Sequence, residues 1–277
     1  ANLDEVRLAF RRLVNLVPRN GLTLLGIDSP HAAALSSHVR SRKQTFGLSA
    51  DAEWRAVNVR VQDGTTFTVT REGRDLGDFS MPLLGDHNVR NALAAIAVGV
   101  DTGCDIERLR AGLAAFKGVK RRLEVVGRAR GVTVYDDFAH HPTAVDETLK
   151  AVRRASPGQR LWAIFEPRSA SSCRRVFQDD FAKALSGADE VVLASVFRSS
   201  LPPEERLSES ELVATLVSQN IRARHLPDVA TIVSTVASEA REGDLIVIMS
   251  NGGFGGIHQK LVDALSGASD HPPAPTS

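Results

Sequence analysis

Short apolar runs alternate with helical stretches through the second half of the chain, and this alternation constrains the fold more than any other feature. The runs are LEVVGRA, VTVYDDF, LWAIFE, EVVLAS, IRARHL and DLIVIMS. The helical stretches lie near residues 143–155, 172–186, 208–219, 229–240 and 256–266. Strands that alternate with helices form a doubly wound sheet. We therefore predict an α/β fold with a doubly wound, Rossmann-like domain in this half.

The first half of the chain has a different pattern. Residues 5–17 place apolar side chains at helical spacing, and the run LTLLGI has the composition of a buried strand. Residues 55–83 alternate apolar and polar side chains between Asp-Gly and Glu-Gly turns, which indicates antiparallel strands. Two more helices are expected at 86–100 and 105–116. This half is therefore predicted to mix helices with antiparallel strands.

With 277 residues the chain is long enough for two domains. We expect one domain at 1–119, a second at 120–266, and a disordered tail at 267–277 that has almost nothing to bury. The formal net charge of +1 gives no electrostatic reason to expect nucleic acid or an anionic membrane as the main partner, and we expect neither. Two widely spaced cysteines and the lack of an apolar run of membrane length favour the cytoplasm.

Two asparagines stand in the first turn of the helix that begins within GDHNVRNALAA. Asp86 or His87 is expected to cap this helix, which places Asn88 and Asn91 three residues apart on one face. Capping plus one surface asparagine explains the pattern about equally well. The functional alternative is hydrogen bonding to a base edge such as adenine, because each amide offers both a donor and an acceptor.

Arginines at two places suit anionic ligands. Lys117, Lys120, Arg121 and Arg122 precede a strand at the domain junction, and Arg168 follows another strand in FEPRS. A solvated basic linker and a surface arginine are the ordinary explanations. The functional alternatives are a phosphate contact from the junction and a carboxylate or phosphate grip by Arg168.

The stretch VYDDFAHHPTA puts four titratable residues at a strand end, where open α/β sheets bind ligands. These residues are Asp136, Asp137, His140 and His141. Adjacent histidines rarely chelate one metal, so no metal site is expected there. Charged loop residues and ligand contacts remain as interpretations, and a metal-dependent hydrolase built on these four residues is an alternative function.

The stretch IVIMSNGGFGGIHQKL sets Ser250, Asn251 and four glycines around Phe254 between a strand and a helix. Glycine-rich turns at helix starts expose backbone N–H groups to anions. The stretch is neither a Walker loop nor a Rossmann fingerprint, because both residue orders are missing. A non-catalytic nucleotide- or peptide-binding module, with this loop as its anion site, is therefore a third hypothesis.

Taken together and in this order, these motifs resemble the Mur ligase family over nearly the whole chain, from residue 1 to about 266. The last motif is most similar to the branch that joins the tripeptide L-alanyl-γ-D-glutamyl-meso-diaminopimelate to UDP-N-acetylmuramate in peptidoglycan recycling. The sister branch, which adds L-alanine to the same nucleotide sugar, shares His-His-Pro-Thr and is the alternative. The resemblance implies an ADP-forming amide ligase that uses ATP and Mg²⁺ and forms an acyl-phosphate intermediate.

The resemblance also implies roles for residues on the nucleotide side. Asn88 and Asn91 match the family's pair near adenine. Arg122 matches the arginine that reaches the transferred phosphate and is expected to be catalytic. Asp137 matches the aspartate near the ATP ribose.

On the acceptor side, His140 and His141 match positions that face the reaction centre and are expected to be catalytic, with no general-base role assigned to either. Arg168 matches the edge where the incoming amino acid or peptide docks. The loop residues that match the same edge are Ser250, Asn251, Gly252 and Phe254. After Arg168-Ser169 the tripeptide branch usually continues with Asn-Thr-Met, whereas this chain departs from that pattern.

Three parts of the family pattern have no counterpart in this sequence: the ATP-binding loop, the magnesium-binding acid and histidine, and the nucleotide-sugar domain. We therefore expect residues 1–119 to be the C-terminal portion of the central ATP-binding domain and 120–266 to be the C-terminal domain. Mg²⁺ ligands are expected outside this chain, and the chain by itself is expected to be inactive.

Overall fold

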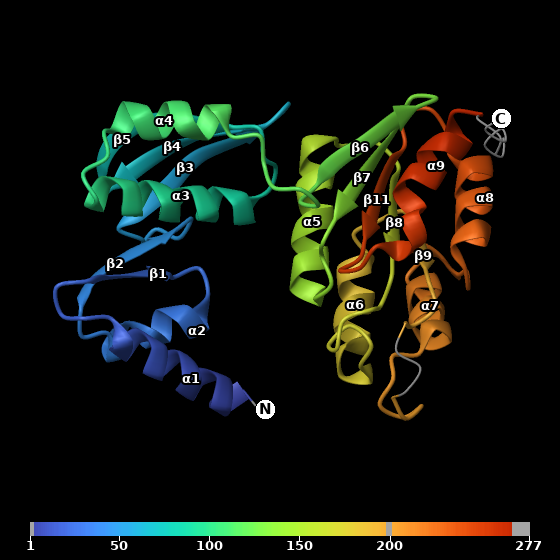
Figure 1. Ribbon diagram of the computed structural model, residues 1–277, viewed down its shortest axis with the longest axis horizontal. Coiled ribbons are helices and arrows are strands. Elements are labelled where there is room, and N and C mark those ends of the chain that lie inside the picture. Colours follow the sequence, from blue (N-terminus) through green and yellow to red (C-terminus); the bar gives the residue numbers. More distant parts are fainter. Residues whose placement is uncertain (1–2, 198–200, 268–277) are drawn as a thin grey trace, which may run out of the picture. The chain divides into compact units, whose positions relative to one another are not determined.

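The protein is described here by a computed structural model that covers residues 3–197 and 201–267. Nearly all of the expected tail lies outside these described residues. The chain divides into two compact units, Ala1–Lys117 and Gly118–Ser277. Both units combine helices with a mixed sheet, which confirms the predicted α/β class (Figure 1).

The N-terminal unit is built on a five-stranded sheet in the order β1-β2-β3-β4-β5. Its strands are β1 (Leu22–Gly26), β2 (Arg42–Gly47), β3 (Trp54–Val61), β4 (Thr65–Arg71) and β5 (Arg74–Met81). The last three strands pair antiparallel, as predicted, while β1, β2 and β3 pair in parallel. The sequence did not predict β2, because RKQTFG is mostly polar and only its last residue is buried.

The helices of this unit are α1 (Leu3–Leu16), α2 (Pro30–Ala33), α3 (Asp86–Asp101) and α4 (Ile106–Ala115), with a 3-10 turn η1 (Ala34–His38). Helices α3 and α4 pack against β3 to β5 around Trp54, Phe67 and Phe79. The expected cap at Asp86 or His87 is wrong. Gly85 occupies the cap position at φ 93°, and no side chain caps the first turn.

The C-terminal unit contains the six predicted strands in one sheet, in the order β10-β9-β8-β11-β7-β6. They are β6 (Glu124–Ala129), β7 (Val132–Asp137), β8 (Leu161–Phe165), β9 (Glu190–Leu193), β10 (Arg222–His225) and β11 (Leu245–Met249). All neighbours pair in parallel except β6, which runs antiparallel to β7. The parallel strands therefore end at one common edge.

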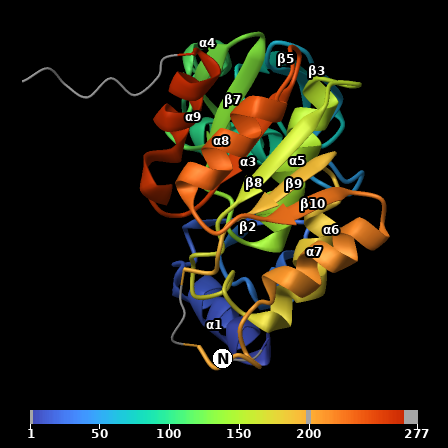
Figure 2. The ribbon, with the colours of Figure 1, turned by 90° about the vertical axis from the view of Figure 1, so that its right-hand side faces the viewer.

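Helices cover both faces of this sheet, as the doubly wound prediction requires. They are α5 (Pro142–Ala155), α6 (Gln178–Leu185), α7 (Glu209–Ser218), α8 (Val229–Glu239) and α9 (Ile257–Leu265), with 3-10 turns η2 (Arg175–Phe177) and η3 (Phe254–Gly256). Helices α5, α6 and α7 pack on one face, and α8 and α9 lie side by side on the other (Figures 1 and 2).

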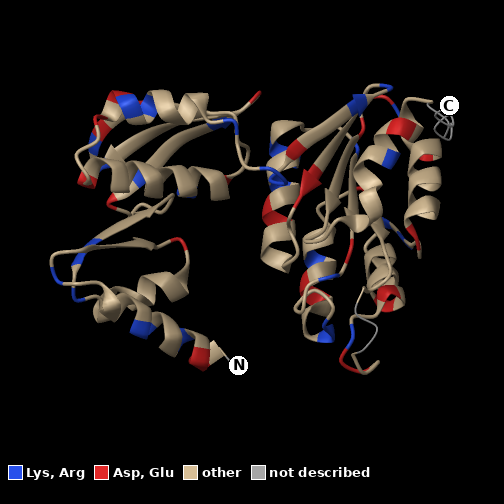
Figure 3. Cartoon of the chain, viewed as in Figure 1, with Lys and Arg blue, Asp and Glu red and all other residues tan. Residues whose placement is uncertain are grey.

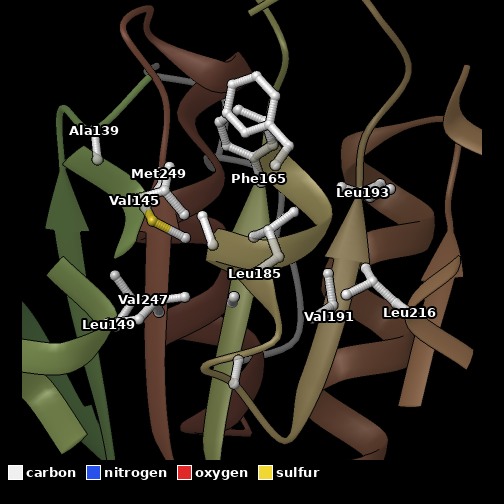
Figure 4. Packing of buried hydrophobic residues seen from close by; sticks show 14 of the residues in the cluster. Ala139, Val145, Leu149, Phe165, Leu185, Val191, Leu193, Leu216, Val247 and Met249 are labelled. Carbon is white, nitrogen blue, oxygen red and sulfur yellow. The ribbon is translucent and has the colours of Figure 1, made fainter. Parts of the chain in front are cut away.

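The core under α5 and α6 packs against the central strands of this sheet, which include β8 and β11. Figure 4 shows Phe165, Val247 and Met249 of the sheet packed against Val145 and Leu149 of α5. Each fully buried side chain of this kind contributes about 1.5 to 3 kcal/mol. These contacts make the strand ends a firm base for polar side chains.

Charged residues are interspersed along the elements of both units (Figure 3). Among the described residues, no helix combines the length and the apolar character needed to cross a bilayer.

Candidate active site

The candidate site of the C-terminal unit lies at the carboxyl ends of β7, β8 and β11. Strand register aligns Asp137 and Phe165 with Met249 of the central strand β11. Just beyond, the N–H of Glu166 donates to the Met249 carbonyl at 3.0 Å, and that of Ser250 donates to the Asp137 carbonyl at 3.1 Å. The motifs around Asp137, Arg168 and Ser250, far apart in sequence, therefore meet at one edge.

The two aspartates of VYDDF are the last residues of β7, and successive side chains of a strand point to opposite faces of its sheet. Asp136 contacts His258 of α9, while Asp137 accepts from Thr148 of α5 at 3.2 Å. Because α9 and α5 cover opposite faces, the two carboxylates do not converge on one ligand.

Asp137 is 4% exposed, and donors of the chain occupy both of its oxygens. Oδ2 accepts from the Leu123 N–H at 2.8 Å, and Oδ1 accepts from the Ala139 N–H at 2.8 Å as well as from Thr148. Burial raises the pKa of Asp137, although these donors and the charge of Arg122 act in the opposite direction. A ribose contact by Asp137 requires one of these bonds to open, and that contact stays a prediction.

The two arginines before β6 have different surroundings. Arg121 sits at φ 61°, in the left-handed region, and is half-buried. Arg122 is exposed, and its guanidinium carbon lies 5.4 Å from the centroid of the Phe138 ring. The residue expected to reach the transferred phosphate is therefore the more exposed of the two arginines.

The two histidines flank the start of α5. Nδ1 of His140 lies 2.8 Å from the carbonyl oxygen of Phe138, which fixes the ring direction. His141 occupies the cap position before Pro142, makes no side-chain cap bond, and packs its ring edge-on against Phe177 at 5.1 Å. Both rings lie at the predicted sheet edge, and their contact with substrates stays a prediction.

Arg168 is half-buried and held from two directions. Its Nη1 lies 3.5 Å from Oε1 of Glu166, and its guanidinium carbon lies 3.7 Å from the centroid of the Phe197 ring. An aromatic ring covers the flat face of a guanidinium group that stacks on it. The N–H groups at the edge of the guanidinium remain available to a carboxylate.

The residues of the glycine-rich loop differ in their access to ligands. Ser250 is 0% exposed and donates its hydroxyl to Oε2 of Glu166 at 2.5 Å, and Phe254 is 3% exposed within the core under α8 and α9. As the structure places them, Ser250 and Phe254 support the loop rather than face a ligand. Asn251 and Gly252 are half-buried and are placed better for contact.

The N-terminal unit holds a separate cavity of 360 Å³ between α3 and α4. Asn88 and Asn91 both line it, and most of the remaining wall is apolar. The Asn88 amide nitrogen also donates to the Leu84 carbonyl at 2.8 Å, whereas Asn91 is exposed. The cavity therefore brings both amides to one apolar wall, and their contact with adenine stays a prediction.

Within the part of the chain that the structure describes, no three His, Cys, Asp or Glu side chains cluster as a metal site would require. The opposite directions of Asp136 and Asp137 argue independently against the hydrolase hypothesis, because its proposed ligands cannot share one ion.

Three features of the site were not predicted from the sequence. Arg121 grips the glycine-rich loop, Glu166 accepts from Ser250, and Phe197 stacks on Arg168. The strand-end position of Glu166 was a usable signal. The other two contacts depend on side-chain directions that no spacing in the sequence reveals.

Comparison with known families matches two consecutive parts of the chain. Residues 1–99 match the Mur ligase middle domain, and residues 121–252 match the glutamate ligase domain of Mur ligases. A UDP-N-acetylmuramate–L-alanine ligase of a Chelativorans species is 38% identical over 91% of this chain and 56% of its own length. The corresponding protein of Desulfotalea psychrophila is 33% identical over 91% and 55%. The chain thus spans little more than half the length of these relatives.

Solved structures show the same fold. A murein peptide ligase from Psychrobacter arcticus is 31% identical with a TM-score of 0.68, and covers 97% of this chain and 56% of its own. A UDP-N-acetylmuramate-alanine ligase from Thermotoga maritima, 21% identical with a TM-score of 0.77 and the same coverage, supports the fold alone. Two family models in the expected order, over most of the described elements, show that the chain belongs to the Mur ligase family.

Proposed function

We propose that this chain forms the acceptor side and part of the nucleotide site of an ATP-dependent amide ligase that acts on UDP-N-acetylmuramate. The observation that carries the proposal is the meeting of Arg122, His140, His141 and Arg168 at one sheet edge in a chain with both Mur ligase matches. Because the chain spans about half of its relatives, the activity belongs to the whole protein that contains it.

The chemistry needs clustered cations. A carboxylate is a poor electrophile until ATP converts it into an acyl phosphate, which the acceptor amine then attacks through a tetrahedral intermediate. Exposed Arg122 suits the charge that develops on the transferred phosphoryl group. Arg168, with its stacked guanidinium, suits a carboxylate of the acceptor.

The nucleotide would place adenine in the cavity between α3 and α4, with Asn88 and Asn91 on its base edge. Mg²⁺ supplies charge neutralisation to ATP when bound, but the acids of this sheet edge do not fit that ion. Asp137 and Glu166 are buried and occupied by donors of the chain. Cys104 and Cys173 form no disulfide within the described residues, and this together with nucleotide-dependent chemistry fits a cytoplasmic location.

Two acceptors are supported by different observations. The relatives at 33% and 38% identity are L-alanine ligases by name, so L-alanine is the better-supported acceptor. This weighs against the tripeptide that the glycine-rich motif led us to expect. The tripeptide remains the second candidate, because that motif resembles its branch and the Psychrobacter arcticus murein peptide ligase is 31% identical.

The decisive experiment is an assay of the full-length protein that contains this chain, with ATP, Mg²⁺ and UDP-N-acetylmuramate. L-alanine and the tripeptide L-alanyl-γ-D-glutamyl-meso-diaminopimelate compete in one reaction, and ADP and both products are measured. We expect ADP release with L-alanine strongly preferred over the tripeptide. Preference for the tripeptide would select the second candidate, and no ADP release with either would contradict the ligase proposal.

A further inference from the structure

Arg121 reaches across the sheet edge to the glycine loop, defined here as residues 250–253. Its Nη2 donates to the carbonyl oxygens of Ser250 at 2.6 Å and Gly252 at 2.8 Å. One guanidinium nitrogen thus joins two carbonyls that are separated by one residue. Charge-assisted bonds of this kind are stronger than neutral ones.

The rest of the Arg121 side chain is anchored by Asp136. Arg121 Nε donates to Asp136 Oδ2 at 3.2 Å, and Nε2 of His258 lies 3.0 Å from Asp136 Oδ1. The Asp136 side chain is 10% exposed, so water competes little with these contacts. The left-handed backbone at Arg121 is a costly conformation for a non-glycine residue, and the carboxylate of Glu124, which accepts from its N–H at 2.8 Å, helps to hold it.

The opposite side of the glycine loop is tied to Arg168. The hydroxyl of Ser250 accepts from the Gly252 N–H at 2.9 Å while it donates to Glu166, the carboxylate that also pairs with Arg168. A β-carbon on Gly252 would stand 2.3 Å from Cδ and Nε of Arg168. The loop backbone therefore forms one wall of the space that Arg168 occupies.

We propose that Arg121 and Asp136 are positioning residues that clamp the glycine loop and thereby set the position of Arg168 for the acceptor's carboxylate. The inference rests on the proposed function for the identity of the ligand. It divides the tandem residues by role: Arg121 and Asp136 fix the acceptor side, whereas Arg122 and Asp137 lie on the nucleotide side. Nothing in the clamp requires a change of its charge during the reaction.

The first test measures amide hydrogen exchange of residues 250–256 in the full 277-residue chain, and needs no activity. Arg121→Ala and Asp136→Asn are expected to speed exchange in this segment about tenfold or more, from the loss of charged hydrogen bonds. Arg121→Lys keeps the charge but lacks the planar fork, so it is expected to protect the loop only in part.

Two controls make the exchange result specific. Arg122→Ala removes the neighbouring charge and is expected to leave loop exchange unchanged. Arg110→Ala removes an arginine of the N-terminal unit that also donates to two carbonyls, those of Leu76 and Asp78. As a control it is also expected to leave exchange of the glycine loop unchanged. Unchanged loop exchange in Arg121→Ala, with the sheet of the C-terminal unit still protected, would overturn the clamp.

The second test uses the full-length ligase and separates the two substrates. Arg121→Lys is expected to raise KM for the acceptor about tenfold, the effect of losing roughly one charged hydrogen bond, and to change KM for ATP less than about twofold. Equal increases in both KM values would contradict the positioning role. If the enzyme shows no ligase activity at all, the proposed function fails, while the exchange test still decides whether the clamp exists.

Discussion

Neighbouring residues of the same type have different environments at this site. The two adjacent arginines differ in environment, because Arg121 donates to the glycine loop whereas Arg122 is exposed. The two adjacent aspartates also differ in environment, because successive side chains of a strand point to opposite faces of the sheet. Asp136 therefore contacts α9 and Asp137 contacts α5. Identical side chains one position apart therefore have different consequences when they are replaced.

Replacing Arg122 by alanine tests its proposed role with the transferred phosphate. In the full-length ligase we expect kcat to fall about 10² to 10³-fold, since a positioned cation acts mainly on transition-state charge. The dissociation constant for ATP is expected to change less than about threefold, because the exposed side chain contributes little to ground-state binding. Single-turnover kinetics and equilibrium nucleotide binding measure the two quantities separately.

Arg128→Ala is the matched control, because Arg128 is another exposed arginine of the same unit, within β6. It is expected to leave both quantities near the wild-type values. Equal losses of rate and ATP affinity in Arg122→Ala would show that this arginine contributes to ATP binding in the ground state, which would contradict the transition-state role.

At the scale of elements, the central strands of the C-terminal unit were predictable because β8, β9 and β11 are mostly apolar and buried along their length, and the helices around them are amphipathic. Strand β2 was not predictable, because most of its side chains are polar and only its last residue is buried. It is held in the sheet by its pairing with β1 and β3. Helix α1 was predicted, yet among its residues Val14 alone is buried. Periodicity therefore identified the helix without showing how much of its apolar face is covered.

The candidate site was predictable to the level of its loops and no further. The rule that ligands bind at strand ends placed Asp137, His140 and Arg168 at one edge. The burial of Ser250 and Phe254 was missed, because a glycine-rich sequence indicates an accessible backbone but does not show which side chains turn into the core.

Helix α4 offers a test of the cavity between α3 and α4. Gly112 lines that cavity, and a β-carbon added there meets no atom within 4 Å. Gly112→Ala is expected to stabilise the unit by about 1 kcal/mol through helix propensity, and to leave ATP affinity within about twofold. Gly112→Leu also favours the helix but fills the cavity, so we expect it to weaken ATP binding about tenfold or more.

Thermal unfolding and ATP titration of the full-length protein measure both effects. The pair is informative because the leucine variant separates loss of binding from loss of stability. Wild-type ATP affinity in Gly112→Leu, with the fold intact, would place adenine elsewhere.

At the scale of the whole molecule, the C-terminal sheet has ionic contacts at the edge opposite the candidate site. Asp244, just before β11, is 3% exposed and accepts from Arg160 at 2.5 Å and from the Trp162 indole at 3.0 Å. Arg160 precedes β8 and also pairs with Glu190 at the start of β9. These contacts join three central strands, so we assign this edge to stability rather than to catalysis.

The Asp244 contacts predict an acid dependence of stability. Burial acts to raise the pKa of Asp244, but hydrogen bonds from Arg160, the Arg241 N–H and Trp162 outweigh it, so its pKa is lowered. A carboxyl with a lowered pKa in the folded state contributes stability above its ordinary pKa of about 4 and loses that contribution as pH falls through the lower folded value. Asp244→Asn is therefore expected to cost about 3 kcal/mol at pH 7, where it removes the closer of the two carboxylates that pair with Arg160.

The difference between wild type and Asp244→Asn should shrink as the pH falls from about 4 through the lower folded pKa of Asp244, because the carboxyl of the unfolded chain takes up a proton first and the folded carboxyl follows. Urea unfolding in a Trp54→Phe background follows this unit alone, since Trp162 is then the single tryptophan of the sequence. Asp146→Asn, which removes an exposed pair with Lys150, is the control and is expected to cost less than about 1 kcal/mol at any pH. An Asp244→Asn difference that stays constant from pH 7 down to acid would mean that packing, and not the ionised carboxylate, holds these strands together.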